Sequence, residues 1–139
     1  MFRTEKMIRF HHCDPTGVVF FPQYLVLCHE VIEDWIENGL KIGFRNLLKN
    51  LGLCTPTVNL HCDFIAPSRF GERLSFDLTV LRLGNSSIRL AIRAHLSDQV
   101  RMRAELVIVL TELAVFRAVP IPDDLRQRML AFAGKDTSA

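Results

Sequence analysis

The chain has 139 residues, 49% of them hydrophobic, and a formal net charge of +2. This length predicts a single domain over residues 1–139, and the composition is sufficient for a hydrophobic core. The charge is too small to indicate a nucleic-acid partner, and no block of Lys and Arg or basic stripe with interleaved aromatic residues occurs. No apolar run approaches the roughly 18 residues of a membrane span, and the N-terminus lacks a signal-peptide pattern. We therefore expect a cytoplasmic protein without a membrane partner.

The first predicted element is a strand within residues 2–10, whose alternate residues share one face: Phe2, Thr4, Lys6, Ile8 and Phe10. A long helix follows, because apolar residues recur at helical spacing at Tyr24, Leu25, Leu27, Cys28, Val31, Ile32, Trp35 and Ile36. Asn38-Gly39 is typical of a helix C-terminus. So broad an apolar stripe predicts a helix that other elements enclose. A second, short helix is indicated by Phe44, Leu47, Leu48 and Leu51.

Three long strands come next, each with alternating apolar residues. The apolar positions are Leu74, Phe76, Leu78 and Val80, then Ile88, Leu90, Ile92, Ala94 and Leu96, then Met102, Ala104, Leu106, Ile108 and Leu110. Gly84-Asn85 and Ser97-Asp98-Gln99 predict tight hairpins, so neighbouring strands should be antiparallel. A last amphipathic turn or two is expected at Leu125, Met129 and Phe132, followed by a frayed tail at 134–139.

Together these elements predict an α+β fold in which a curved antiparallel sheet of about five strands wraps a long central helix. Such a sheet leaves edge strands and one face of the helix uncovered. Association with further copies of the chain is the usual way to cover them.

A constrained turn before the long helix carries one carboxylate, Asp14. Pro15 disfavours helical backbone at Asp14, Gly17 can adopt positive φ, and Pro22 suits the first turn of a helix. Because Pro22 has no N–H, the unpaired donors at this positive helix end come from neighbours such as Phe21. A carboxylate near a carbonyl that a backbone N–H polarises can hydrolyse a thioester or ester without a metal. Asp before Pro and Gly is also typical of a structural Asx turn.

The segment Cys13-Asp14-Pro15-Thr16-Gly17-Val18-Val19-Phe20-Phe21-Pro22-Gln23-Tyr24 resembles the signature of the 4-hydroxybenzoyl-CoA thioesterases, a branch of the hot-dog-fold acyl-CoA thioesterases. A second segment, Asp63-Phe64-Ile65-Ala66-Pro67 followed by Phe70-Gly71-Glu72-Arg73-Leu74, is similar to the strand-turn-strand segment after the central helix of that family. The resemblance covers roughly residues 3–117. The first motif is the more specific one, and the second mostly reports the fold.

The resemblance implies a hot-dog enzyme that hydrolyses a small or medium acyl-CoA, with aromatic acyl groups among the candidates. Asp14 would be the nucleophile or the general base, and the Phe21 backbone amide would polarise the thioester carbonyl. No cofactor is implied, since coenzyme A is part of the substrate. The resemblance also implies homodimers that assemble into tetramers, with active sites at the dimer interface.

Substrate contacts are implied for Gly17, Tyr24, His29, Val58, Asn59 and His61. Contacts with the nucleotide end of CoA are implied for Arg82, Asn85, Ser86, Ser87, Arg89 and Arg117. Relatives commonly carry an acidic group where this chain has His12 and His29, so the acyl group is left open.

Other hypotheses are a metal site among His11, His12, Cys13, His29 and His61, and a Cys13 thiolate nucleophile, although the spacing matches no ligand pattern. The four cysteines, Cys13, Cys28, Cys54 and Cys62, are expected to be reduced thiols because no CxxC pair occurs. Two rival functions also stay open: a non-catalytic protein that binds an acyl-CoA or an aromatic ligand, and a hot-dog hydratase or dehydratase.

Overall fold

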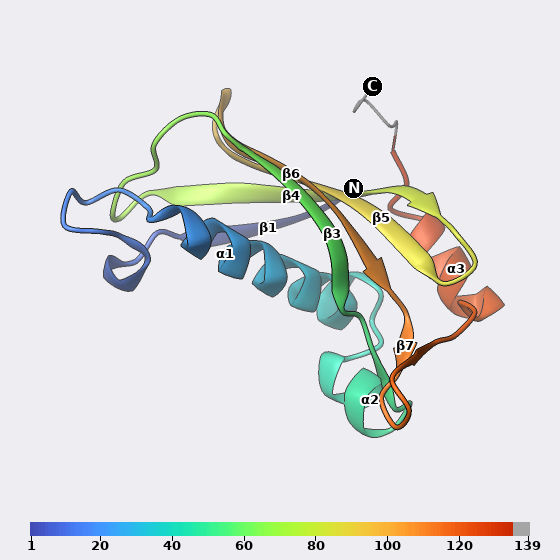
Figure 1. Cartoon of the computed structure of the whole chain (residues 1–139). Helices are drawn as coiled ribbons and strands as arrows, with labels where there is room; N and C mark the ends of the chain where they lie inside the picture. The colour runs from blue at the N-terminus through green and yellow to red at the C-terminus, as the bar shows by residue number, and fades with distance from the viewer. Residues whose placement is uncertain (135–139) are drawn as a thin grey trace.

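The computed structural model describes residues 1–134 and contains a five-stranded antiparallel sheet that curves around one long helix, α1 (Phe21–Asp34) (Figure 1). The strand order is β1-β4-β5-β6-β3. The strands are β1 (Phe2–Met7), β3 (Thr57–Phe64), β4 (Arg73–Leu83), β5 (Ser87–Leu96) and β6 (Gln99–Val109). This arrangement confirms the predicted α+β hot-dog fold, including the three long strands and the two hairpins between them.

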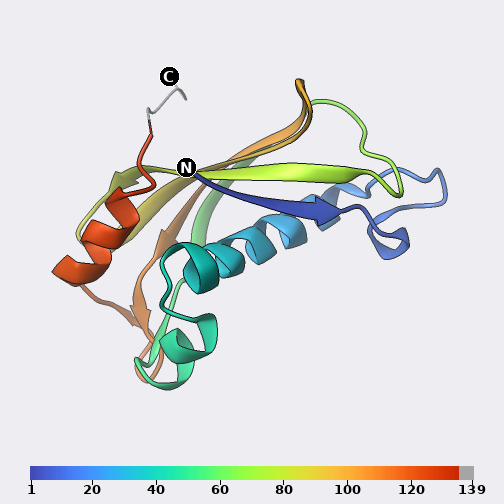
Figure 2. The same ribbon diagram turned by 180° about the vertical axis from the view of Figure 1, so that it is seen from behind.

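Shorter elements surround this sheet. The helical ones are η1 (Phe10–His12), the π-helical turn η2 (Trp35–Gly39), α2 (Phe44–Lys49) and α3 (Asp123–Leu130). A small second sheet of order β2-β7-β8 joins β2 (Leu53–Cys54), β7 (Thr111–Glu112) and β8 (Arg117–Ala118). Figure 2 shows α3 at the end of the main sheet opposite to the loop that precedes α1.

The prediction for the first strand is correct only in part. β1 ends at Met7, and Phe10 lies in η1 with its ring exposed instead of sharing the buried face of the strand. The expected frayed tail lies outside the described residues except for Gly134, whose N–H donates to the Val80 carbonyl at 3.1 Å.

No helix among residues 1–134 is long and apolar enough to span a membrane.

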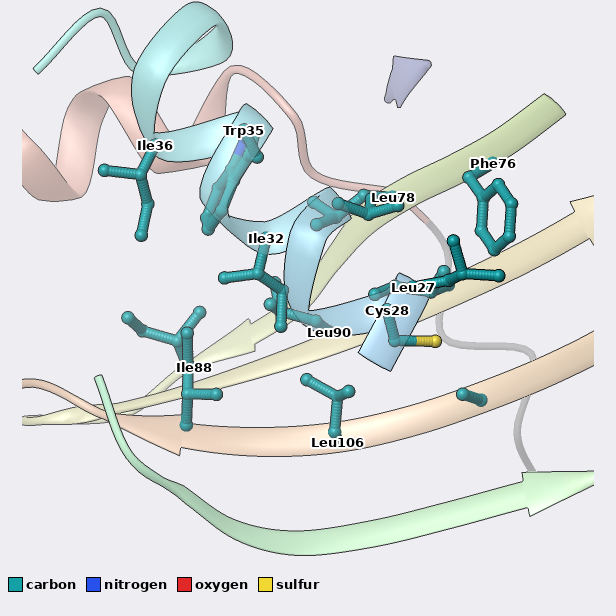
Figure 3. Close-up of a cluster of buried hydrophobic side chains, with 14 of the residues drawn as sticks. Leu27, Cys28, Ile32, Trp35, Ile36, Phe76, Leu78, Ile88, Leu90 and Leu106 are labelled. Carbon is teal, nitrogen blue, oxygen red and sulfur yellow. The ribbon is translucent and has the colours of Figure 1, made fainter. Parts of the chain in front are cut away.

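The core lies between α1 and the concave face of the sheet (Figure 3). The strand side chains labelled in Figure 3 are Phe76, Leu78, Ile88, Leu90 and Leu106, and the labelled ones of α1 and η2 are Leu27, Cys28, Ile32, Trp35 and Ile36. None of these is more than 4% exposed. The alternation in the strands and the helical stripe therefore predicted the core correctly. Both patterns come from local geometry, which points alternate strand residues and every third or fourth helix residue to one side.

Gly39, the last residue of η2, packs against the ring of Trp35. A Cβ atom at Gly39 would lie 2.7 Å from Cδ1 of Trp35, so only glycine fits at this position. The predicted C-terminus at Asn38-Gly39 is confirmed in position, but Gly39 is not the left-handed cap that the pattern suggested: the residue with positive φ is Lys41, at 57°.

The outer face of the sheet is polar. The strand register aligns one charged residue from each strand in a row, namely Arg3, Asp77, Arg93, Arg103 and Asp63. Buried Asp77 accepts hydrogen bonds from Arg3 at 2.6 Å and from His95 at 2.9 Å. The fold therefore covers only one face of its sheet, as antiparallel sheets commonly do.

Candidate active site

The Asp14 turn is a tight hairpin that leads directly into α1. The Asp14 N–H donates to the Val18 carbonyl at 3.1 Å, and the Gly17 N–H donates to the Asp14 carbonyl at 3.0 Å. Gly17 has φ +81°, as its position in the motif predicted. A bridge between Cys13 and Val19 closes the hairpin. Local backbone rules therefore place Asp14 on a rigid turn.

The Asp14 carboxylate is half-buried and ionised. Its Oδ1 accepts hydrogen bonds from the hydroxyl of Thr16 and, at 2.9 Å, from the Thr16 backbone N–H. These bonds, with the hydroxyl the stronger influence, hold the pKa of Asp14 below its ordinary value. This is the Asx-turn geometry, but it uses one oxygen only, and Oδ2 accepts no hydrogen bond within residues 1–134. The structural role of Asp14 and a chemical role are thus compatible.

The start of α1 offers an unpaired donor. Phe20 precedes the helix and its N–H donates to the His12 carbonyl at 3.0 Å, which fixes the approach to α1. The Phe21 N–H donates to no backbone carbonyl of the described residues, and Pro22 has none to donate. The first turn of a 14-residue helix also carries the positive end of its dipole. A carbonyl oxygen that becomes negatively charged would be stabilised here.

A cavity of about 220 Å³ adjoins this helix start, between α1 and the chain that follows β3. Its lining consists of Val18, Val19, Phe21, Tyr24, Phe64, Ile65, Ala66 and Pro67. The Phe64 ring lies 5.8 Å from the Phe21 ring and 5.7 Å from the Tyr24 ring, between centroids. The wall is therefore aromatic, which suits a flat apolar group.

The cysteine and histidine hypotheses lose support from the local chemistry. Burial, with the Asp14 charge as a smaller cause, raises the pKa of Cys13, whereas a nucleophilic cysteine needs a lowered one. Burial, and then the neighbouring His11, lower the pKa of His12, and its Nδ1 accepts the Arg9 N–H at 2.8 Å. Within residues 1–134, no three His, Cys, Asp or Glu side chains lie together as potential metal ligands.

The structure brings only some of the predicted substrate residues together. Gly17 lies in the Asp14 hairpin, and Tyr24 lies one turn into α1 beside the cavity. His29 is exposed further along α1, and Val58, Asn59 and His61 are exposed on β3, the edge strand. None of these last four lines the cavity of this single chain.

The predicted CoA-binding residues lie far from Asp14 within one chain. Arg82, Asn85, Ser86, Ser87 and Arg89 belong to the β4–β5 hairpin. β4 has eleven residues, so this hairpin lies roughly 35 Å from the start of β4, near which the Asp14 hairpin lies (Figures 1 and 2). Arg89 pairs with Glu105 at 2.9 Å, and Arg117 lies in β8 of the small sheet. A single chain therefore does not bring these predicted residues together with Asp14.

The residues that support the hairpin were not predicted. Ser68, Glu72 and Arg101 form a buried polar cluster with Tyr24 beside the cavity. Glu72 belongs to the second motif, which was the only sequence signal for this cluster. Arg101 falls in the outward phase of its strand, so the alternation predicts exposure where the structure shows burial.

Comparison with known proteins identifies the family of this chain. The family model of the Thioesterase-like superfamily matches residues 8–129. A 1,4-dihydroxy-2-naphthoyl-CoA hydrolase of Synechococcus elongatus is 29% identical over 126 residues, covering 90% of this chain and 92% of that protein. Another such hydrolase, from Synechococcus sp. strain WH7803, is 35% identical over 103 residues, covering 70% of this chain and 67% of that protein.

Solved structures agree as well. The crystal structure of a 1,4-dihydroxy-2-naphthoyl-CoA thioesterase from Synechocystis is similar to this chain with a TM-score of 0.82 and 25% sequence identity, covering 92% of this chain and 94% of that one. Because the family model spans most of the sequence and the fold agrees, the chain belongs to the Thioesterase-like superfamily and is a thioester hydrolase.

Proposed function

We propose that the chain hydrolyses an aromatic acyl-CoA to the free acid and CoA, with Asp14 as the reacting carboxylate. One observation carries the proposal: an ionised carboxylate with a free oxygen stands on the hairpin that leads into α1, and the Phe21 N–H there is unpaired. Two routes use the same atoms. In the first, an oxygen of Asp14 attacks the thioester carbon, the C–S bond breaks, and water hydrolyses the resulting anhydride.

In the second route Asp14 accepts a proton from water while the water oxygen attacks the same carbon. In both routes CoA leaves as a thiolate that takes up a proton, and the Phe21 N–H donates to the carbonyl oxygen as its negative charge grows. Neither route needs a metal or a further cofactor.

The aromatic wall of the cavity supports an aromatic acyl group. The relatives named above act on 1,4-dihydroxy-2-naphthoyl-CoA, and a two-ring acyl group of that class would lie against Phe21, Tyr24 and Phe64. A cavity of about 220 Å³ is smaller than the roughly 300–1,000 Å³ typical of ligand pockets. We infer that a second copy of the chain completes the wall.

The free edge of β3 is the surface that we propose for this contact. β3 pairs with β6 on one side only, and Val58 and Leu60 on it are 62% and 42% exposed. Antiparallel pairing of two β3 edges would cover these side chains and the open backbone groups. It would also bring Val58 and Asn59 of the partner subunit toward Phe64, at the end of β3 beside the cavity. His29 and His61 then belong to surfaces near the completed site.

The residues of the β4–β5 hairpin, together with Arg117, would bind the CoA nucleotide only from a neighbouring copy, within a dimer or the expected tetramer. Their basic side chains suit phosphate groups. Neutralising Arg82 would then raise KM for the CoA ester more than it lowers kcat.

The test is hydrolysis of aromatic, short-chain and medium-chain acyl-CoAs by the wild type and Asp14→Asn, followed through release of the free thiol. We expect turnover of aromatic esters that Asp14→Asn loses by at least about 10³-fold, with its fold and oligomeric state intact. If the CoA esters raise the melting temperature but none is hydrolysed, the chain is a binding protein and the proposal fails.

A further inference from the structure

A buried arginine lies beneath the loop of residues 65–72. Arg101, on β6, is 5% exposed. Its Nη1 donates to the Pro67 carbonyl at 3.0 Å and to Glu72 Oε1 at 2.8 Å, and its Nη2 donates to Glu72 Oε2 at 3.0 Å. Nη1 also lies 3.4 Å from the Ser68 hydroxyl. One guanidinium thus holds three residues of this loop.

The same loop holds the Asp14 hairpin. The Val19 N–H donates to the Ser68 carbonyl at 2.9 Å, and the Phe70 N–H donates to the Gly17 carbonyl at 3.1 Å. Val18 and Arg69 form a bridge between these two bonds. The path from Arg101 to the hairpin therefore consists of consecutive short contacts.

A second path leads from Arg101 to the start of α1. The Tyr24 hydroxyl donates to the Ser68 hydroxyl at 2.6 Å, and Ser68 is fully buried. Tyr24 and Pro67 both line the aromatic cavity. Ser68 is thus the junction where β6, the loop and α1 meet.

Stability alone gives little reason to bury this ion pair. Hydrogen bonding from Arg101 is the main cause that lowers the pKa of Glu72 to about 2, so the pair is charged at any working pH. Replacing a buried pair with apolar side chains is often neutral or stabilising, because buried charges lose hydration. Here the Arg101 side chain is 7% exposed and that of Glu72 is 24% exposed, so the loss falls mainly on Arg101. A bidentate guanidinium and carboxylate pair does fix geometry, however, since both groups are planar and their bonds are directional.

We propose that Arg101 is a positioning residue that, through Glu72 and Ser68, sets the place of the Asp14 hairpin relative to the first turn of α1. The inference rests on the proposed thioesterase reaction. Arg101 acts through the loop and touches no reacting atom. Its loss should therefore reduce the rate of the reaction more than the binding of the substrate.

The first test is Arg101→Lys, which keeps the charge but cannot donate in the bidentate manner. We expect kcat to fall about 10- to 100-fold while KM changes less than about threefold, since displacements near 1 Å can cost a hundredfold in rate. Arg103→Lys is the matched control, because Arg103 is exposed on the same strand. A kcat of Arg101→Lys within about twofold of the control would overturn the proposal.

Hydrogen exchange provides a readout that does not depend on activity. The Val19 and Phe70 amides, which join the hairpin to the loop, should exchange faster in Arg101→Lys and at the wild-type rate in Arg103→Lys. Unchanged exchange would overturn the proposal, whereas a wild type without turnover would instead refute the proposed reaction.

If Arg101→Lys does not fold, Ser68→Ala decides the matter, because it removes only the junction. It should lower kcat several-fold with KM nearly unchanged, and an unchanged kcat refutes the positioning role.

Discussion

Replacing Leu27 with alanine tests whether burial of the apolar face of α1 holds the helix, and with it the site, on the sheet. Leu27 is 1% exposed, and the substitution removes three buried carbon atoms. Their transfer to water costs about 2 kcal/mol, and the cavity left behind raises the loss to about 3–4 kcal/mol. For 139 residues the unfolding entropy is about 0.3 kcal/mol/K, so the melting temperature should fall by about 12 °C.

Val26→Ala is the matched control for this measurement. Val26 is the preceding residue of the same helix but is 49% exposed, so its truncation should change the free energy of unfolding by less than about 0.5 kcal/mol. Urea unfolding and thermal melts should be compared at one protein concentration, because dissociation of an oligomer also shifts both. A loss below about 1 kcal/mol for Leu27→Ala, or equal losses for the two variants, would refute the reasoning.

Three further predictions concern the site, its support and its assembly. Thr16→Val removes the side-chain hydrogen bond that lowers the pKa of Asp14 most, so this pKa should rise. The acid limb of the pH profile of kcat/KM should then move to higher pH. If the acid limb stays at the same pH, a group other than Asp14 controls it. Hydrogen bonding from its buried arginine partner lowers the pKa of Glu72 from 4.5 to about 2. The stability from this pair is therefore present above pH 4.5 and is lost as the pH falls toward 2. Urea unfolding of Glu72→Gln should show a smaller loss than the wild type over that interval, and parallel curves would contradict the assignment. Leu60→Lys places a charge on the edge of β3, so it should dissociate the proposed oligomer, as measured by sedimentation velocity. Leu51→Lys is the control, because Leu51 is exposed beyond α2, and it should leave the oligomer intact. If Leu60→Lys sediments like the wild type, the β3 interface is excluded.

The parts of the fold that were predicted correctly depend on local periodicity. β4, β5 and β6 each have ten or eleven residues, long enough for alternation to be recognised, and α1 carries a continuous apolar stripe. The strands β2, β7 and β8 have two residues each and cannot show a period, so the small second sheet was missed. The alternation up to Phe10 extended past the true end of β1, because the chain turns into η1.

The candidate site also contains a part that local sequence patterns predict and a part that they do not. Pro15, Gly17 and Pro22 act on their own backbone, which is why the Asp14 hairpin and the start of α1 could be predicted. Arg101 is 29 residues from Glu72 along the chain, and no local pattern connects them. The CoA-binding hypothesis is harder still to predict, since in the proposed assembly the arrangement of the copies would decide which β4–β5 hairpin lies near which Asp14.

The contrast between residues fixed by a local motif and residues fixed by distant contacts decides which properties can be inferred from one thioesterase to another by sequence similarity. The Asp14 hairpin is specified by a short motif, so under the proposed reaction a match there would transfer the reacting carboxylate and the helix donor together. The walls for the acyl group are different in the proposed dimer, because Val58 and His29 are exposed in a single chain and would take their surroundings from a second copy. We therefore expect substitutions at these exposed positions to change which acyl-CoA is preferred, at a nearly constant rate for the best substrate. Substitutions in the Arg101 cluster should instead lower the rate for every acyl-CoA, because they displace the Asp14 hairpin that carries the proposed reacting group.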